Sequence, residues 1–333
     1  MVEYNLENQL VISRSTTRDV NDQEGSLPRW DQNYLQLEKG DFYGEITSIS
    51  YPGLQLFSEF NNKVVDKKCS AEADSFCIGI PKKTLGSGYW CGHNILEDTL
   101  FFLSPNDELN FKTPSLSHIY VAVLKSSLIE TLIDPTGSLK IKLLGSGAIH
   151  VEQGFASMFR AYIESAINEV LENPSVYSKN SVENNIAEGI VNMLYLMQNN
   201  ENYYRLRGKQ KVHRYLVDKT KQLIMSNPSE PLTVSEVCKN LRVSRRCLHS
   251  AFVNVLGVNP TSYIRSVRLN QVHRELLNSE EGVLVRDIAA KWGFWHLGMF
   301  SKYYKEMFHE LPSSSLGKGS EKQIRFDSYL LSR

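Results

Sequence analysis

One helical pattern occurs twice between Thr233 and Leu316, and this repeat constrains the fold more than any other feature of the chain. Each copy has two short segments whose apolar residues follow the spacing of one helix face. They are Val234, Val237, Cys238, Leu241, Leu248, Phe252 and Val255 in the first copy, and Val285, Ile288, Ala289, Trp292, Phe300, Tyr304 and Met307 in the second. The copies are offset by 51 residues before the turn and by 52 after it. Two amphipathic helices joined by a short turn form a helix-turn-helix, so the sequence predicts two such units and double-stranded DNA as their partner.

The two copies differ in the signals that start their helices. In the first, Thr233 and Glu236 have the spacing of a capping box, and Ser244 is suited to cap the second helix. In the second, Gly293 suits a positive φ in the turn, but no Ser, Thr, Asp or Asn precedes the next helix. Trp295 stands there instead, and either core packing or contact with a sugar or thymine methyl would suit it.

Polar side chains that open the two reading helices are candidates for DNA contact. Arg245, Arg246 and His249 begin the first, and such donors reach guanine edges or phosphates. A solvated surface would also account for any single one of them. Only His296 and Lys302 are of this kind in the second. We therefore expect base reading mainly from the first unit, with phosphate and shape contacts from the second.

A helix is also predicted between the copies, from Pro260 to Asn278. Its 19 residues, at about 1.5 Å of rise each, span roughly 28 Å. Successive major grooves on one face of B-DNA lie about 34 Å apart. This helix is thus about long enough to place both units in adjacent grooves, where the second binds at high effective concentration.

Charge is divided unevenly, although the formal net charge of the chain is zero. From Arg205 to Arg333 there are 22 Lys and Arg against 11 Asp and Glu, whereas residues 1–204 have 15 against 26. A merely solvated surface would explain the charge alone. Together with the repeat, the basic half indicates a polyanionic partner.

Composition excludes several classes of protein. A chain of 333 residues is long enough for two domains with cores. Its five cysteines include no C-x-x-C pair, which disfavours a disulfide scaffold and a zinc site. There is neither a leader with a basic start nor an 18-residue apolar run, so we expect a soluble, cytoplasmic protein without membrane contact.

The amino-terminal half has the pattern of short strands. Residues 1–28 lack periodicity and are expected to form a mobile tail. Alternation along His118–Leu124 and turn signals such as Pro52-Gly53 predict a small barrel or sandwich within a domain at 29–200. The remaining divisions are a linker at 201–211, an all-α DNA-binding domain at 212–317 and a tail at 318–333.

Two helices are expected to end this half, at 154–172 and 181–199. Their apolar stripes suit packing against the strands and equally suit a partner helix in a homodimer. Several aromatic residues either line an effector pocket or fill the core, and core packing is the simpler account. They are Tyr43, Phe57, Phe60, Phe76 and Phe102.

The carboxy-terminal motifs resemble those of the AraC/XylS family of bacterial transcription regulators over about 100 residues. The motifs are Val243-Ser244-Arg245-Arg246-Cys247-Leu248, Leu256-Gly257-Val258-Asn259-Pro260, Arg265-Ser266-Val267-Arg268-Leu269 and Asp287-Ile288-Ala289-Ala290-Lys291-Trp292-Gly293-Phe294. The run from Trp292 to Gly298 further resembles the ethanolamine-operon regulator branch, as do the segments 41–45 and 74–81 more weakly. No recognisable binding motif for the ligands of that branch, ethanolamine and adenosylcobalamin, is present.

The resemblance implies an α+β chain with a cupin-like amino-terminal β-barrel and two helices, followed by a double helix-turn-helix. The first part would bind a small-molecule effector of unknown chemistry or dimerise, and the second would activate transcription with RNA polymerase. The implied DNA-facing positions are Arg245, Arg246, His249 and Ser250 in the first reading helix, and His296, Leu297, Gly298 and Lys302 in the second. Two departures are Arg242, where the family often has glycine, and Trp295, where a polar cap is usual.

Two other classes compete with a regulator. A cupin-type metal oxygenase would need clustered ligands such as His-x-His, whereas His93, His118 and His150 are isolated in the sequence. An architectural protein would bind DNA without sequence preference. We expect a regulator without catalytic residues, metal ligands or a cofactor.

Overall fold

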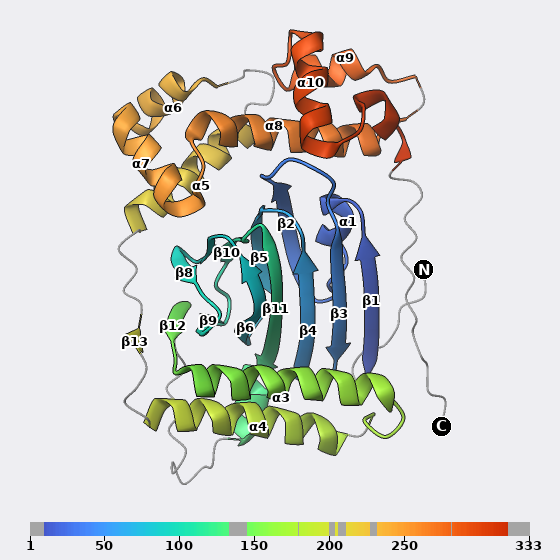
Figure 1. Cartoon of the computed structure of the whole chain (residues 1–333), viewed down its shortest axis with the longest axis vertical. Helices are drawn as coiled ribbons and strands as arrows, with labels where there is room; N and C mark the ends of the chain where they lie inside the picture. Colours follow the sequence, from blue (N-terminus) through green and yellow to red (C-terminus); the bar gives the residue numbers. More distant parts are fainter. Residues whose placement is uncertain are drawn as a thin grey trace.

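The computed structural model describes residues 10–132, 145–178, 180–199, 204–205, 211–226, 232–280 and 282–318. Antiparallel strands and a few helices make up the amino-terminal half and helices the carboxy-terminal half, which confirms the predicted α+β class. In Figure 1 the strands stand in the middle, with α3 (Gln153–Glu172) and α4 (Asn180–Asn199) across one end. The carboxy-terminal helices cover the other end.

The strands form two antiparallel sheets, which fit the sandwich that the turn pattern predicted as an alternative to a barrel. They do not close into the cupin-like barrel that the family resemblance implied. The larger sheet has the order β1-β3-β4-β11-β6-β9-β12-β13 and the smaller β2-β5-β10-β7-β8. In these orders the larger comprises Val11–Thr17, Gly44–Ser50, Leu54–Asn61, Leu116–Lys125, Ser75–Leu85, Thr99–Leu103, Gly147–His150 and Tyr204–Arg205. The smaller comprises Trp30–Gln36, Val65–Ala71, Leu109–Lys112, Gly88–Trp90 and His93–Ile95.

Aromatic side chains fill the space between the two sheets. The ring centroid of Trp90 in the smaller sheet lies 4.2 Å from that of Phe101 in the larger and 5.3 Å from that of Phe111. All three side chains are buried. Interdigitated side chains of this size fill the space of about 10 Å that separates two packed sheets. The two sheets therefore pack face to face.

The central strand β11 is buried on both faces, which confirms the strand predicted from His118 to Leu124. Successive side chains of a strand point to opposite faces. Ile119, Val121 and Val123 belong to the core between the sheets, while Tyr120, Ala122 and Leu124 belong to the core under the long helices. A strand covered on both sides carries apolar residues at successive positions, as this one does from Ile119 to Leu124.

The long helices α3 and α4 pack on the outer face of the larger sheet. Phe159 and Val170 of α3 share one core with Ile190 and Met197 of α4 and with strand residues such as Tyr120. The apolar stripes predicted from the sequence are therefore used inside the chain. Self-association through 154–172 and 181–199 stays a prediction.

The aromatic residues proposed for an effector pocket do not gather at one place. Phe76 and Phe102 lie in the core under the long helices, and Phe57 lies between the sheets. Tyr43 and Phe60 are half-buried and meet edge to face, with ring centroids 6.1 Å apart. Core packing accounts for the buried three.

The predicted mobile tail over 1–28 is wrong for residues 10–28. Strand β1 pairs with β3 along its whole length, and the short helix α1 (Val20–Glu24) follows it. The buried positions of β1 include Ser13 and Thr17, and Thr17 Oγ1 donates a hydrogen bond to Gln23 Oε1 at 2.6 Å. A strand whose buried side chains are polar has no hydropathy pattern, and this explains the error.

The carboxy-terminal half is built around one long helix, α8. The helices are α5 (Lys211–Ser226), α6 (Val234–Leu241), α7 (Arg245–Leu256), α8 (Pro260–Leu277), α9 (Val285–Lys291) and α10 (Leu297–Phe308), with a 3-10 turn at Pro312–Ser315. Val267 of α8 lies in the core of α5 to α7, and Val272 lies in the core of α9 and α10. The predicted helix between the two units is thus confirmed, and both units are packed on it.

Parts of the predicted division lie outside the described residues. These are 1–9, most of the linker at 201–211 and all but Lys318 of the tail at 318–333.

A further helix, α2 (Ser126–Leu132), follows β11. No described helix combines the length and the apolar character needed to cross a membrane.

Candidate nucleic-acid interface

Both caps predicted for the first helix-turn-helix unit are confirmed. Glu236 N donates to Thr233 Oγ1 at 3.3 Å, and Thr233 N donates to Glu236 Oε2 at 2.6 Å. The Thr233 hydrogen bonds lower the pKa of the Glu236 carboxyl. Ser244 Oγ accepts from Cys247 N at 3.1 Å. These bonds determine where α6 and α7 begin, and so which side chains occupy the first turn of α7.

The turns of the two units begin in the same way. Each has one residue in the left-handed region, Arg242 (φ 54°) in the first and Gly293 (φ 79°) in the second, as predicted for Gly293. The bonds that follow also match, with Val243 N donating to Cys238 O at 3.0 Å and Phe294 N to Ala289 O at 2.9 Å. This is the pattern of a Schellman motif, and it stands at the 51-residue offset found in the sequence.

The polar face of α7 is open. Arg245, Arg246 and His249 are exposed and Ser250 is half-buried, while Leu248 between them is fully buried. The helix therefore turns its apolar side to the core and three donor side chains outward. Their role in binding DNA stays a prediction.

The corresponding face of α10 is also open but has a different chemistry. His296, Leu297, Gly298 and Lys302 are exposed, and the N-cap residue His296 makes no capping hydrogen bond, as the missing cap signal predicted. Trp295 is 57 % exposed, so core packing does not account for it. The opening of α10 thus offers an indole and a leucine to a partner where α7 offers two arginines.

A groove of about 670 Å³ lies between the first unit and the turn of the second. Its lining includes Arg245 from α7, Arg265 and Arg268 from α8 and Phe294 from the second turn. Sequence reasoning did not assign Arg265 and Arg268 to the interface. Their spacing of three residues on a helix already predicted to link the units was the signal that could have found them.

A contact with a neighbouring residue holds the guanidinium group of each of these two arginines. The Arg265 guanidinium lies over the ring of Tyr303, 4.3 Å from its centroid. Arg268 Nη2 donates to Leu232 O at 2.8 Å. Burial lowers the pKa of Arg268, and the charge of Glu236 opposes that shift.

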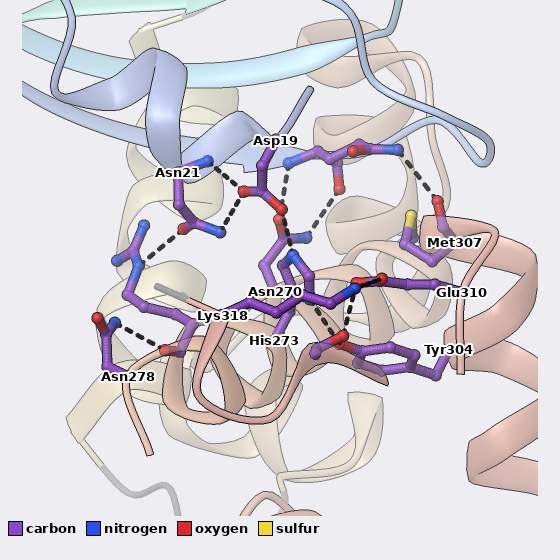
Figure 2. A network of polar contacts seen from close by, with 12 residues as sticks. Asp19, Asn21, Asn270, His273, Asn278, Tyr304, Met307, Glu310 and Lys318 are labelled. Atoms are coloured by element: carbon purple, nitrogen blue, oxygen red, sulfur yellow. Dashed lines mark hydrogen bonds and ion pairs between the residues drawn. The ribbon is translucent and has the colours of Figure 1, made fainter. Parts of the chain in front are cut away.

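Another face of α8 rests on the amino-terminal half, as Figure 2 shows. His273 is hydrogen-bonded both to Asp19 and to Tyr304. Arg274 forms an ion pair with Glu24 at 2.6 Å. The helix that carries both helix-turn-helix units is therefore held by residues of the short helix α1 and its N-cap.

The histidines considered for a metal oxygenase have other surroundings. His118 Nε2 is hydrogen-bonded to Ser58 Oγ at 2.8 Å, and burial lowers the pKa of His118. His150 Nδ1 lies 3.4 Å from an oxygen of Asp98. Within the described ranges no group of three or more His, Cys, Asp or Glu side chains is arranged to hold a metal ion.

Comparisons with known proteins agree with the geometry of the carboxy-terminal half. Residues 237–316 match the model of a family described as a helix-turn-helix domain. The probable thc operon regulatory protein of Rhodococcus erythropolis is 37 % identical over 94 residues, 27 % of this chain and 28 % of that protein. The XylDLEGF operon transcriptional activator 2 of Pseudomonas putida is 31 % identical over 96 residues, 28 % of this chain and 61 % of that protein.

Among solved structures, the AraC-like transcriptional activator CuxR is 19 % identical, with a TM-score of 0.40 over 79 % of this chain and 96 % of that one. Each of these proteins is named as a regulator or an activator, not as an enzyme. The chain spans less than two thirds of the length of either curated relative. The family match over residues 237–316 identifies a helix-turn-helix domain in the carboxy-terminal half of this chain, and the paired units on α8 agree with the resemblance of its motifs to the AraC/XylS family.

Proposed function

We propose that this chain is a sequence-specific, DNA-binding transcription regulator, and that it acts as an activator. The observation that carries the proposal is that two helix-turn-helix units share α8, each with an open face at the start of its second helix. Two units fixed on one helix can read two segments of one duplex. The relatives named as activators support activation, for which RNA polymerase is the expected partner.

Within this proposal the two units have different roles. Arg245, Arg246 and His249 read base edges in a major groove, where arginine is suited to guanine. His296 and Lys302 hold the backbone, while Trp295 lies against sugars or thymine methyls. The division follows from the exposed donors on α7 and the exposed indole before α10.

Selection from a random-sequence DNA library tests the proposal. The full chain should enrich one motif and bind it roughly 10³-fold more tightly than unrelated DNA at physiological salt. Arg246→Ala should relax the preference at one base pair of that motif, at a cost of about 1–3 kcal/mol. Equal affinity for selected and unrelated DNA would instead identify an architectural DNA-binding protein. Activation is tested by a reporter placed downstream of the selected motif, with Arg246→Ala as the control in which activation should be reduced.

We also propose that a small-molecule effector bound to the amino-terminal half controls DNA binding. Strand β5 supports this, because it joins the space between the sheets to α8. Lys67 forms a buried ion pair with Glu59 at 2.5 Å and lies over the ring of Tyr34, 4.6 Å from its centroid. The next side chain toward the amino terminus, Asp66, accepts a hydrogen bond from Tyr263 of α8 at 2.9 Å. A ligand that shifts β5 would therefore shift α8 as well.

A thermal-shift screen of small polar metabolites on the full chain tests this control. A compound that raises the unfolding temperature should also change the affinity for the selected duplex. In Tyr263→Phe, which keeps the ring and removes the bond to Asp66, the compound should still bind but should change DNA affinity less. An equal change in both proteins would contradict transmission through Tyr263.

A further inference from the structure

The groove between the two units has the position of a third contact with DNA. When two units enter successive major grooves, the minor groove and its two phosphate backbones lie between them. The 18 residues of α8 span about 27 Å, so this helix runs along the same interval. The side of α8 that carries Arg265 and Arg268 lines the groove, between the first unit and Phe294 in the turn of the second.

The chemistry of the groove suits phosphate. Three guanidinium groups enter it, from Arg245, Arg265 and Arg268, and their forks match phosphate oxygens. The hydroxyls of Ser235 and Thr261 join the same lining and are residues that often contact DNA phosphates. Among the described residues that line the groove there is no Asp or Glu.

Acidic residues lie near the groove and leave its charge positive. The charge of Glu236 acts on Arg268, but Glu236 Oε2 accepts hydrogen bonds from both the backbone N–H and the hydroxyl of Thr233 in the capping box. The hydrogen bond from Lys39, its ion-pair partner, lowers the pKa of Glu306, and the charge of Arg265 contributes to this shift. Two carboxylates with other partners face three guanidinium groups, so the groove keeps an excess of positive charge.

We infer that this groove binds the phosphate backbone of DNA between the two major-groove contacts, with Arg265 and Arg268 as its principal ligands. The inference rests on the proposed function and adds two contact residues from the helix that joins the units. Such contacts fix the register of both units on the duplex and carry no base preference. The stacking of Arg265 on Tyr303 and the bond from Arg268 to Leu232 O hold both guanidinium groups in place before DNA binds.

Salt dependence of DNA affinity tests this site. The binding constants of the full chain for the selected duplex and for a scrambled duplex are measured at several KCl concentrations. Arg265→Gln and Arg268→Gln should each weaken binding to both duplexes by about tenfold and lower the slope of log K against log salt by about 0.9. Arg265→Lys and Arg268→Lys keep the charge and should keep most of the slope. Arg14→Gln, at an exposed position on β1, is the matched control and should change neither quantity.

The possible results separate the site from the proposed function. Unchanged slopes in both glutamine variants would overturn the site, and so would a loss confined to the selected duplex, which would indicate base contacts. Unchanged DNA binding with lost reporter activation would also overturn it and would assign the groove to a protein partner. If no sequence is enriched, the proposed function fails, yet the scrambled duplex still tests the groove. All variants are measured at a temperature at which each is folded, so that a slope lost in the glutamine variants and kept in the lysine variants reports the loss of charge.

Discussion

Asn270 on α8 pairs with the backbone of Gln36 on β2 as a neighbouring strand would. Asn270 Nδ2 donates to Gln36 O and Gln36 N donates to Asn270 Oδ1, each at 2.9 Å, and both residues are buried. Strand β2 is at the edge of the smaller sheet, where backbone groups have no neighbouring strand. The Asn270 amide thus forms the two hydrogen bonds that the Gln36 backbone lacks from a neighbouring strand, and it joins the two halves of the chain.

Asn270→Ala should destabilise the contact between the halves. It leaves a buried backbone N–H and a buried C=O without partners, at roughly 1–3 kcal/mol each. Urea unfolding of the full chain should show a loss of about 3 kcal/mol. Asn278→Ala, at the C-cap of the same helix, is the control, because among the described residues the Asn278 side chain donates to Arg274 O at the exposed end of α8. Equal losses in the two variants would contradict a special role for Asn270.

Acid should weaken the same contact through Asp19. Burial would raise the pKa of Asp19, but the hydrogen bond and the charge of His273 hold it below its ordinary value of 3.8. A lowered folded-state pKa means that ionised Asp19 stabilises the folded chain above that value, and that this stability is lost as pH falls through the folded-state pKa. The difference in unfolding free energy between wild type and Asp19→Asn should therefore be constant near pH 5 and shrink below about pH 4. Asp31→Asn, at an exposed position on β2, is the control variant. A difference that stays constant down to pH 3 would contradict the stabilising role of ionised Asp19.

The left-handed residues in the two turns predict opposite effects of substitution. Arg242→Gly removes a side chain from a backbone conformation that costs a non-glycine residue about 1 kcal/mol, so it should stabilise the chain by about that amount. Gly293→Ala introduces the same cost and should destabilise it by about 1 kcal/mol. Both are measured by urea unfolding. A loss of stability in Arg242→Gly would mean that its side chain makes a contact worth more than the strain.

The caps of the two reading helices predict a separation of stability from DNA affinity. Ser244→Ala removes a capping bond and should cost about 1 kcal/mol of stability. His296→Ala removes no capping bond, so stability should stay within about 0.5 kcal/mol while DNA affinity falls. Unfolding and DNA-binding measurements on both variants check this. A large stability loss in His296→Ala would show that the residue is structural.

Local signals made much of the carboxy-terminal half predictable. Thr233 and Ser244 cap helices where their residue types and spacing indicated, and Gly293 adopts the positive φ expected of it. These features depend on hydrogen bonds within four residues, which the sequence records directly. The polar strand at Val11–Thr17 was missed for the opposite reason, since its burial depends on distant partners such as Gly44–Ser50.

The sequence by itself determined the two units, their caps, the linking helix and the basic character of their half, because each is a local pattern of period, spacing or charge. Only the tertiary structure decided that Arg265 and Arg268 face a groove between the units, and that Asn270 and His273 hold α8 against strand β2 and the start of helix α1. Those relationships join residues up to 254 positions apart in the chain. They arise when three faces of one helix are buried against three different neighbours, which no periodic pattern in a single segment can specify.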